Sequence, residues 1–107
     1  MSPIRWWHWL PRFHYFLAGN VEHADEVPER IPAKAAVLVG TLRQPKWLAF
    51  DCPCRTGHRI LIPLDHSYRP HWQVLSTAPL TISPSVDYQT QKQSCHYFIR
   101  NGRVLWT

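Results

Sequence analysis

The chain has 107 residues, of which 12 are Lys or Arg and 7 are Asp or Glu, and this gives a formal net charge of +5. This length supports one domain, and a hydrophobic content of 45% is enough for a core and argues against intrinsic disorder. Ten prolines divide the chain into short pieces and exclude a bundle of long helices. The basic residues are spread along the sequence without a cluster, so nucleic acid is not an expected partner.

Residues 1–20 are predicted to form an aromatic N-terminal segment that is helical or irregular. Its aromatic side chains recur at three- and four-residue spacing, which is typical of a short amphipathic helix, and Gly19-Asn20 indicates a turn at its end. The recurring residues are Trp6, Trp9, Phe13 and Phe16. Such a stripe suits packing in a core or a contact between copies of the chain, so an oligomer formed through these aromatics is one expectation.

The hydrophobic stretch at residues 6–10 is too short for a transmembrane helix, which needs about 18 or more apolar residues. Pro11 and Arg12 interrupt it, so the continuous apolar centre of a signal peptide is missing. We therefore expect a cytoplasmic protein without a membrane partner.

Residues 21–107 are predicted to form a single small, mainly β domain with antiparallel strands. The segment 21–34 carries two prolines and indicates extended chain or a short helical turn. Short apolar runs bounded by turn residues then mark strands at 35–39, 47–50, 59–64, 71–75, 79–82, 97–100 and 103–106. Asn101-Gly102 between the last two runs is typical of a hairpin with a two-residue type I′ turn. We expect Trp47, Trp72 and Trp106 to belong to the core of this domain.

The three cysteines indicate a metal site within this β domain. An odd number without a signal peptide argues against a disulfide framework. Cys52 and Cys54 would face the same side of a strand, although the usual zinc knuckle has a longer spacing. Cys95 together with His58 or His96 would complete a tetrahedral set. The alternative is that the cysteines are small buried hydrophobic residues. We favour zinc, because small domains need additional stabilisation.

Ser85 and His96 are candidates for nucleophilic catalysis. They lie eleven residues apart, at the expected facing ends of two neighbouring strands, where a histidine could take the proton of a serine hydroxyl. Cys95 is a second candidate nucleophile, but neighbouring residues of a strand point to opposite faces, which weakens a pair with His96. The carboxylates available to orient the histidine are Asp51, Asp65 and Asp87. On spacing alone, a turn hydroxyl and a core or ligand imidazole are the simpler interpretation.

The order of short motifs over residues 27–106 resembles a small bacterial domain family of unknown function. The motifs are Val27-Pro28-Glu29, Ile31-Pro32, Val37-Leu38-Val39, Cys52-Pro53-Cys54 with Gly57, Trp72, Ser83-Pro84-Ser85-Val86, His96 to Gly102, and Trp106. Members of this family are encoded in operons with ubiquitin-like proteins and their activating and conjugating enzymes, often linked to antiphage defence. Their cysteines resemble a zinc site, and their Ser and His imply a peptidase that processes or removes the ubiquitin-like protein.

The resemblance implies roles for particular residues, and the chain also departs from the family pattern. Cys52 and Cys54 match the first motif, typically Cys-x-Cys-x-Cys-Gly, and Ser85 and His96 match the Ser and the His. The departures are Thr56 and Gln93 at two cysteine positions, and Cys95 in place of the serine before His96. Either the metal is lost, or the site is rebuilt with Cys95 and His58 as replacement ligands. We prefer the rebuilt site, in which Cys52, Cys54, Cys95 and His58 bind a structural zinc ion.

The expected function is therefore a zinc-stabilised Ser–His peptidase acting on a ubiquitin-like protein, with Ser85 as nucleophile and His96 as proton shuttle. The alternative is a non-catalytic, zinc-stabilised module that binds the ubiquitin-like protein or its conjugation enzymes. In that case the tryptophans at positions 6, 7 and 9 would be the anchors of the interface. A zinc-ribbon-like nucleic-acid binder is a third and weaker hypothesis, and it predicts binding that falls steeply with salt.

Overall fold

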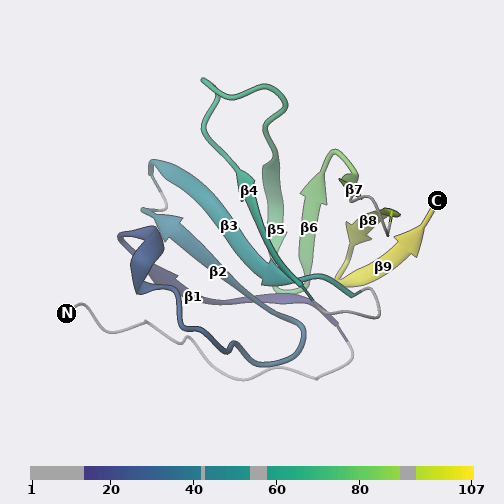
Figure 1. Ribbon diagram of the computed structural model, residues 1–107, viewed down its shortest axis with the longest axis horizontal. Helices are drawn as coiled ribbons and strands as arrows, with labels where there is room; N and C mark the ends of the chain where they lie inside the picture. The colour runs from purple at the N-terminus through teal and green to yellow at the C-terminus, as the bar shows by residue number, and fades with distance from the viewer. Residues whose placement is uncertain (1–13, 42, 54–57, 90–93) are drawn as a thin grey trace.

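A computed structural model of the chain describes residues 14–41, 43–53, 58–89 and 94–107 (Figure 1). The described residues form nine β-strands and one 3-10 helix of three residues, Ala24–Glu26. The strands are β1 (Phe16–Val21), β2 (Ala35–Gly40), β3 (Pro45–Asp51), β4 (Arg59–Pro63), β5 (Gln73–Thr77), β6 (Leu80–Ser83), β7 (Val86–Gln89), β8 (Ser94–Arg100) and β9 (Arg103–Trp106).

The strands form three small sheets, with the orders β1-β2-β3-β4, β5-β6 and β7-β8-β9. In the view of Figure 1 the four-stranded and three-stranded sheets lie on opposite sides, with the β5-β6 hairpin between them. Strands β1 and β2 pair in parallel, and every other described pair is antiparallel. The prediction of a mainly β, antiparallel-rich fold is therefore confirmed for the described residues. The zinc site of that prediction is not shown.

Strand β1 differs from the sequence-based prediction, because Gly19 and Asn20 lie inside it and do not form a turn. Its pairing with β2 contains an irregularity between Leu17 and Gly19. The side-chain amide of Asn20 donates hydrogen bonds to the backbone carbonyl groups of Leu38 and Gly40, at 3.1 and 2.8 Å. Asn20, a residue type that usually favours turns, is therefore stabilised within β1 by hydrogen bonds to the neighbouring strand β2. The predicted helical stripe is wrong for its last member, because Phe16 begins strand β1, and its members at positions 6, 9 and 13 lie outside the described residues.

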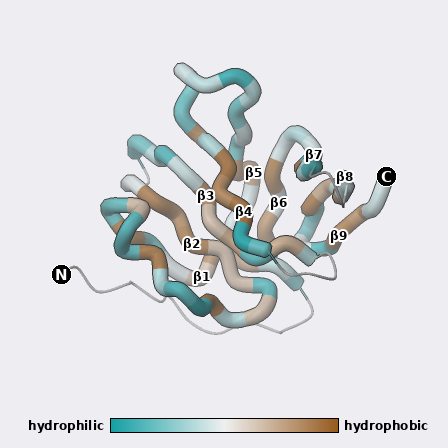
Figure 2. The backbone as a smooth tube through the Cα atoms, viewed as in Figure 1, coloured by the Kyte–Doolittle hydropathy of each residue, from teal (hydrophilic) through white to brown (hydrophobic). Residues whose placement is uncertain are grey.

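The core is formed by inward-facing residues of all three sheets, and the hydrophobic stretches of β2, β3, β4 and β6 appear as brown segments near the centre of Figure 2. The largest fully buried side chains include Phe50 and Tyr97, neither of which has any exposed surface. Trp47 and Trp72 are half-buried and pack against core clusters, as predicted. The prediction for Trp106 is wrong, because its side chain is 57% exposed on β9, an edge strand, and contacts Tyr97 only from outside the core.

Three segments that are distant in the sequence meet in a closed ring of backbone hydrogen bonds. The N–H of Tyr15 donates to the carbonyl of Gly102 at 2.8 Å, Gly102 donates to Leu80 at 2.6 Å, and Leu80 donates to Tyr15 at 2.9 Å. This backbone ring joins the start of β1, the start of β6 and the turn between β8 and β9. One set of hydrogen bonds therefore connects all three sheets.

The turn between β8 and β9 has the geometry that the sequence predicts. Asn101 has φ 52° and Gly102 has φ 77°, so both central residues are left-handed, as a type I′ turn requires. A Cβ atom at position 102 would lie 2.7 Å from Cβ of His14 and 2.9 Å from the carbonyl oxygen of Tyr15. Both the backbone conformation and the close packing therefore call for glycine here.

We expect Gly102→Ala to lower the free energy of unfolding by about 1–3 kcal/mol, because it adds a left-handed alanine and a steric clash. Urea denaturation monitored by tryptophan fluorescence measures this loss. Asn101→Gly is the matched control, since Gly-Gly also suits a type I′ turn and nothing is added to the contact with His14. Equal stability of the Gly102→Ala variant and the unmodified protein would contradict the assignment.

No helix among the described residues is long and apolar enough to cross a membrane.

Candidate active site

The Ser85 hydroxyl and the His96 imidazole are in direct contact. Oγ of Ser85 lies 2.8 Å from Nε2 of His96, within the distance at which a histidine can accept the proton of a serine. With Nδ1 protonated, Nε2 accepts this hydrogen bond, and the pair then has the arrangement of an activated nucleophile. The structure therefore brings together the two residues that the sequence singled out.

Strand register places the two side chains on the same face. Asp87 and His96 are direct partners in the β7-β8 pair, and Ser85 precedes Asp87 by two residues. Because side chains alternate along a strand, Ser85 shares the face of Asp87 and His96. Val86 and Tyr97 point the opposite way and are buried. The Ser–His pair therefore lies on the outer, solvent-facing side of the three-stranded sheet, above a packed core.

Trp72 fixes the backbone at Ser85. Its indole N–H donates to the carbonyl oxygen of Ser85 at 3.2 Å, and its backbone N–H donates to the carbonyl oxygen of Pro63 at 2.8 Å. One residue thus links the segment before β7 to the end of β4. The sequence predicted a core position for Trp72 and placed it among the motifs of the resemblance, without predicting this contact. The available signal was that a half-buried indole N–H needs an acceptor.

The three candidate carboxylates have different surroundings. Asp51 is in an ion pair with Arg59, with Oδ1 2.7 Å from Nε, and belongs to the four-stranded sheet, whereas Ser85 precedes β7 of the three-stranded sheet. The backbone N–H of Ser67 donates to Asp65 and lowers the pKa of this carboxyl group, which identifies Asp65 as a turn-forming residue. Asp87 lies opposite His96, but its carboxylate accepts from the side chain of Gln89. Within the described ranges, no carboxylate lies at ion-pair distance from His96.

Of the described members of the predicted zinc site, Cys95 lies on β8 and faces the core, whereas Cys52 follows β3 and His58 precedes β4. Cys52 and Cys95 are buried, and Sγ of Cys52 is 3.1 Å from the hydroxyl of Tyr97. The ring of His58 stacks on Tyr88 at a centroid distance of 3.8 Å, and Tyr88 is the strand partner of Cys95. Thiol and imidazole groups are the donors that zinc prefers in structural sites.

These three side chains do not by themselves form a metal centre. Among residues 14–41, 43–53, 58–89 and 94–107, no group of three or more His, Cys, Asp or Glu side chains is close enough to hold a metal ion. Cys54, the fourth predicted ligand, lies outside the described residues. The chemistry of the donors fits zinc, and the zinc site itself remains a prediction.

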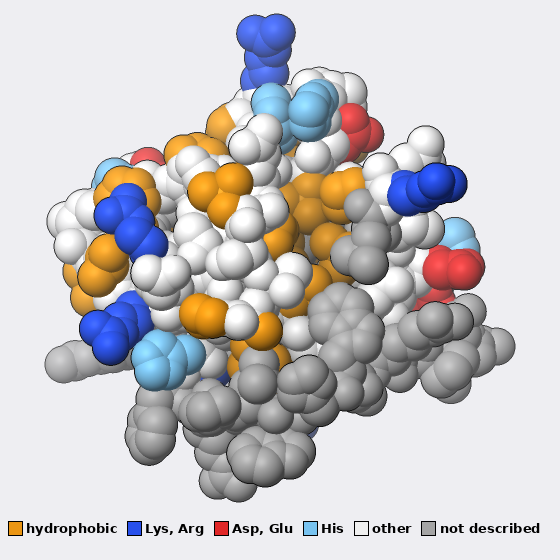
Figure 3. Space-filling view, turned by 180° about the vertical axis from the view of Figure 1, so that it is seen from behind, with side chains coloured by type: hydrophobic (Ala, Val, Ile, Leu, Met, Phe, Trp, Pro, Cys, Tyr) orange, Lys and Arg blue, Asp and Glu red, His pale blue; other side chains and the backbone are white. Residues whose placement is uncertain are grey.

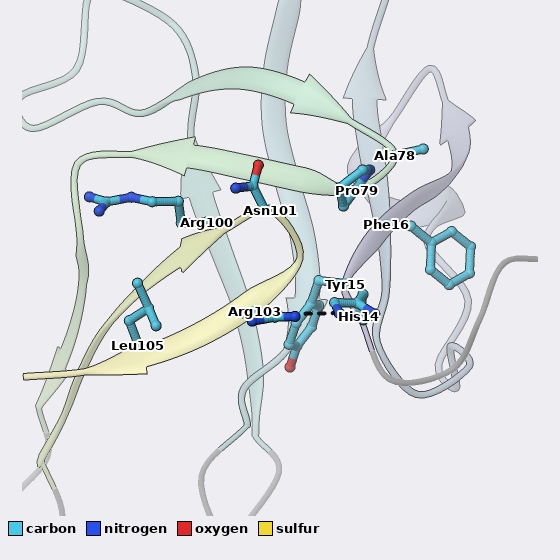
Figure 4. A pocket seen from close by; sticks show the side chains of 9 residues that line it. All are labelled: His14, Tyr15, Phe16, Ala78, Pro79, Arg100, Asn101, Arg103 and Leu105. Atoms are coloured by element: carbon cyan, nitrogen blue, oxygen red, sulfur yellow. Dashed lines mark hydrogen bonds between the residues drawn. The ribbon is translucent and has the colours of Figure 1, made fainter.

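A cavity of about 620 Å³ lies beside the β8-β9 turn, as Figure 4 shows. Arg100 and Arg103 contribute to its wall, and Nε of Arg103 lies 3.5 Å from Nε2 of His14. Neither Ser85 nor His96 lines this cavity. We place the candidate active site at the Ser–His pair, because reactive geometry identifies a site more directly than cavity size does.

On the face drawn in Figure 3, the Lys and Arg side chains of the described residues lie at separate places and do not form a continuous patch. This face of the described residues therefore does not present the continuous basic groove that follows a phosphate backbone.

Comparison with known protein families identifies the chain. A family model described as bacterial ubiquitination-like system serine protease (BubE) matches residues 23–107. The chain belongs to this family. None of the curated proteins and none of the solved structures compared with it gives a match. BubE membership confirms the resemblance to a family of ubiquitin-like conjugation systems, and the matched range contains both Ser85 and His96.

Proposed function

We propose that this BubE domain is a serine peptidase that cleaves the bond following the C-terminal tail of a ubiquitin-like protein, in a precursor or a conjugate. The observation that carries the proposal is the 2.8 Å contact between Ser85 Oγ and His96 Nε2, in a chain whose family is named for a serine protease. The partners are then the ubiquitin-like protein and the enzymes that conjugate it. We place the reaction in the cytoplasm, where cysteine thiols stay reduced.

The proposed reaction has two steps. Oγ of Ser85 attacks the carbonyl carbon while its proton passes to Nε2 of His96, and the protonated His96 then gives this proton to the leaving amine. The carbon–nitrogen bond breaks and an acyl ester remains on Ser85. His96 next takes a proton from water, the resulting hydroxide attacks the ester, and the proton returns to Oγ. Backbone N–H groups near Ser85 stabilise the negative oxygen in both steps.

Cys95 is less suited to be the nucleophile than Ser85. It follows the pattern of buried, core-facing residues on β8, whereas His96 next to it points outward and is exposed. A thiol on the inner face cannot pass its proton to an imidazole on the outer face. This placement supports Ser85 as the attacking residue and leaves Cys95 for a structural role.

We further propose that Cys52, Cys54, Cys95 and His58 hold a structural zinc ion. The support is the chemistry of the donors and the contact between Cys52 and the buried Tyr97 hydroxyl, which would stabilise a thiolate in such a site. When bound, the metal would join the segment that links β3 and β4 to β8, which carries His96. Its role is structural, and no step of the reaction passes through it.

Metal analysis tests the zinc proposal. Protein expressed with zinc in the medium should contain about one zinc ion per chain, and Cys52→Ser should lose most of it, because a structural site needs four ligands. His66→Ala is the control, since His66 stacks on His71 in an exposed loop outside the proposed set. Unmodified protein purified without metal under these conditions would contradict the proposal.

Cleavage of a precursor tests the peptidase proposal. The precursor is the ubiquitin-like protein of the same conjugation system with residues beyond its mature C-terminus, and mass spectrometry locates the cut. A single cut directly after the mature C-terminus is expected. Binding of precursor and conjugate without cleavage of either would refute the peptidase and would instead support the non-catalytic binding module.

A further inference from the structure

Two sheet edges line one groove close to Ser85. Strand β4 is the last strand of the four-stranded sheet, and β7 is the first strand of the three-stranded sheet. A groove with a volume of about 230 Å³ lies between them, lined by residues 59–63 of β4, residues 86–88 of β7, and Trp72. Edge strands carry backbone N–H and C=O groups that their own sheet does not satisfy.

The hydrogen bonds at the two ends of β4 show which of its backbone groups face the groove. The N–H of Cys52 donates to the carbonyl of His58, and the N–H of Leu64 donates to the carbonyl of Lys46, both at 2.8 Å. Even-numbered residues of this segment therefore bond to β3. Because the direction of bonding alternates along an antiparallel strand, the N–H and C=O of Leu61 point away from β3, into the groove.

The same reasoning applies to β7. The N–H of Thr107 donates to the carbonyl of His96 at 3.0 Å, so the backbone groups of His96 face β9. Its neighbours on β8 then face β7 and bond to Val86 and Tyr88, their register partners. The N–H and C=O of Asp87 consequently point away from β8, toward the groove. Within the described residues, no hydrogen bond from another segment reaches the backbone of Leu61 or Asp87.

From this geometry we infer that the groove binds the tail of the ubiquitin-like protein as an extended strand between β4 and β7. Such a tail forms backbone hydrogen bonds with Leu61 on one side and Asp87 on the other, which is the chemistry that an exposed sheet edge offers. The groove is smaller than the 300–1,000 Å³ typical of sites for drug-sized ligands, so it suits a backbone with small side chains. The inference rests on the proposed function and specifies how its substrate is recognised.

The position of the groove relative to Ser85 supports this substrate. Ser85 precedes Asp87 by two residues, about 7 Å along an extended chain. Trp72 closes the groove at the Ser85 end, because it bonds to the carbonyl oxygens of both Pro63 and Ser85. A strand paired with Asp87 therefore delivers its end to the serine hydroxyl, and the sheet edges determine the register of the cut.

An N-methyl scan of the tail tests the inference on an unaltered groove. The probe is a fluorescent peptide with the ten C-terminal residues of the ubiquitin-like protein, and binding is measured by fluorescence anisotropy with Ser85→Ala, which cannot cleave. Each peptide carries one N-methyl group, which removes one N–H donor. Affinity should fall about three- to tenfold at each position that lies within the groove and stay unchanged outside it, because successive N–H groups of the tail pair alternately with β4 and with β7.

A pair of variants tests the protein side. Leu61→Pro removes the N–H that faces the groove and leaves the hydrogen bonds to β3, whereas Leu61→Ala removes only side-chain atoms. The proline variant should bind the peptide about three- to tenfold more weakly than the alanine variant. Losses at every second position only would mean that a single edge binds the tail, and this result, like no binding by Ser85→Ala, would overturn the groove and leave cleavage by the unmodified enzyme unaffected. A continuous run of losses without cleavage would retain the groove and refute the peptidase.

Discussion

Replacing Ser85 by Ala is expected to lower kcat for cleavage of the ubiquitin-like precursor by about a thousandfold or more, with little change in KM. The reason is that the hydroxyl forms the bond to the substrate carbonyl, so its removal takes away the covalent intermediate. His96→Gln should cause a loss of similar size, because Oγ then has no base. The double variant should be no slower than the single ones, since the two groups act as a unit.

Ser94→Ala is the matched control for this prediction. Ser94 is an exposed serine on β8, two residues before His96 and on the same face, whereas the Ser85 hydroxyl bonds to His96. Its loss should leave kcat within about twofold. The melting temperature of each variant, measured by circular dichroism, separates lost chemistry from lost folding. A Ser85→Ala variant that cleaves at the normal rate would assign catalysis to another residue.

Truncation of Tyr97 is expected to cause the largest loss of stability. Its side chain is fully buried at the centre of β8, packs against Trp106, and has its hydroxyl 3.1 Å from Sγ of Cys52. Tyr97→Ala should lower the free energy of unfolding by about 3–5 kcal/mol, because it leaves a cavity between tightly packed strands. Domains of this size are stable by about 5–15 kcal/mol, so a large share of the stability is lost. Urea denaturation measures the effect.

Tyr97→Phe divides this loss into two parts. Phenylalanine retains the ring and removes only the hydroxyl, so the expected loss is about 0.5–1.5 kcal/mol for one hydrogen bond. If the phenylalanine variant is as unstable as the alanine variant, the contact with Cys52 is more important than packing. That result would point to a site around Cys52 that depends on the hydroxyl.

The parts of the fold that follow from local sequence patterns were predictable. Strands β2 and β9 coincide with apolar runs, and Asn101-Gly102 specifies its own turn. Strands β1 and β7 were missed. Gly19 and Asn20 are typical turn residues. They lie in a strand here because the side-chain amide of Asn20 donates hydrogen bonds to carbonyl groups of β2. Strand β7 has only four residues, and its pattern of Val86 and Tyr88 between polar residues is too short to identify a strand by itself.

The candidate site, like the fold, could be predicted from the sequence only in part. The spacing of Ser85 and His96 made them only candidates, and by itself it favoured a turn hydroxyl and a core or ligand imidazole. The resemblance to the family singled out both residues. The contact of Trp72 with Ser85 and the groove between β4 and β7 could not be predicted, because they depend on how separate sheets pack. The spacing of residues along the chain does not determine how far apart the edges of two separate sheets lie.

The backbone ring of Tyr15, Leu80 and Gly102 has a consequence for the order in which the three sheets join during synthesis. Tyr15 leaves the ribosome first, and its hydrogen-bond partners Leu80 and Gly102 follow 65 and 87 residues later. Strand β1 can pair with β2, but its attachment to the other two sheets must wait until Gly102 emerges. The contact between Ser85 and His96 can also form only after strand β8 has emerged. A nascent chain that stops before Gly102 is therefore expected to lack the junction of the three sheets.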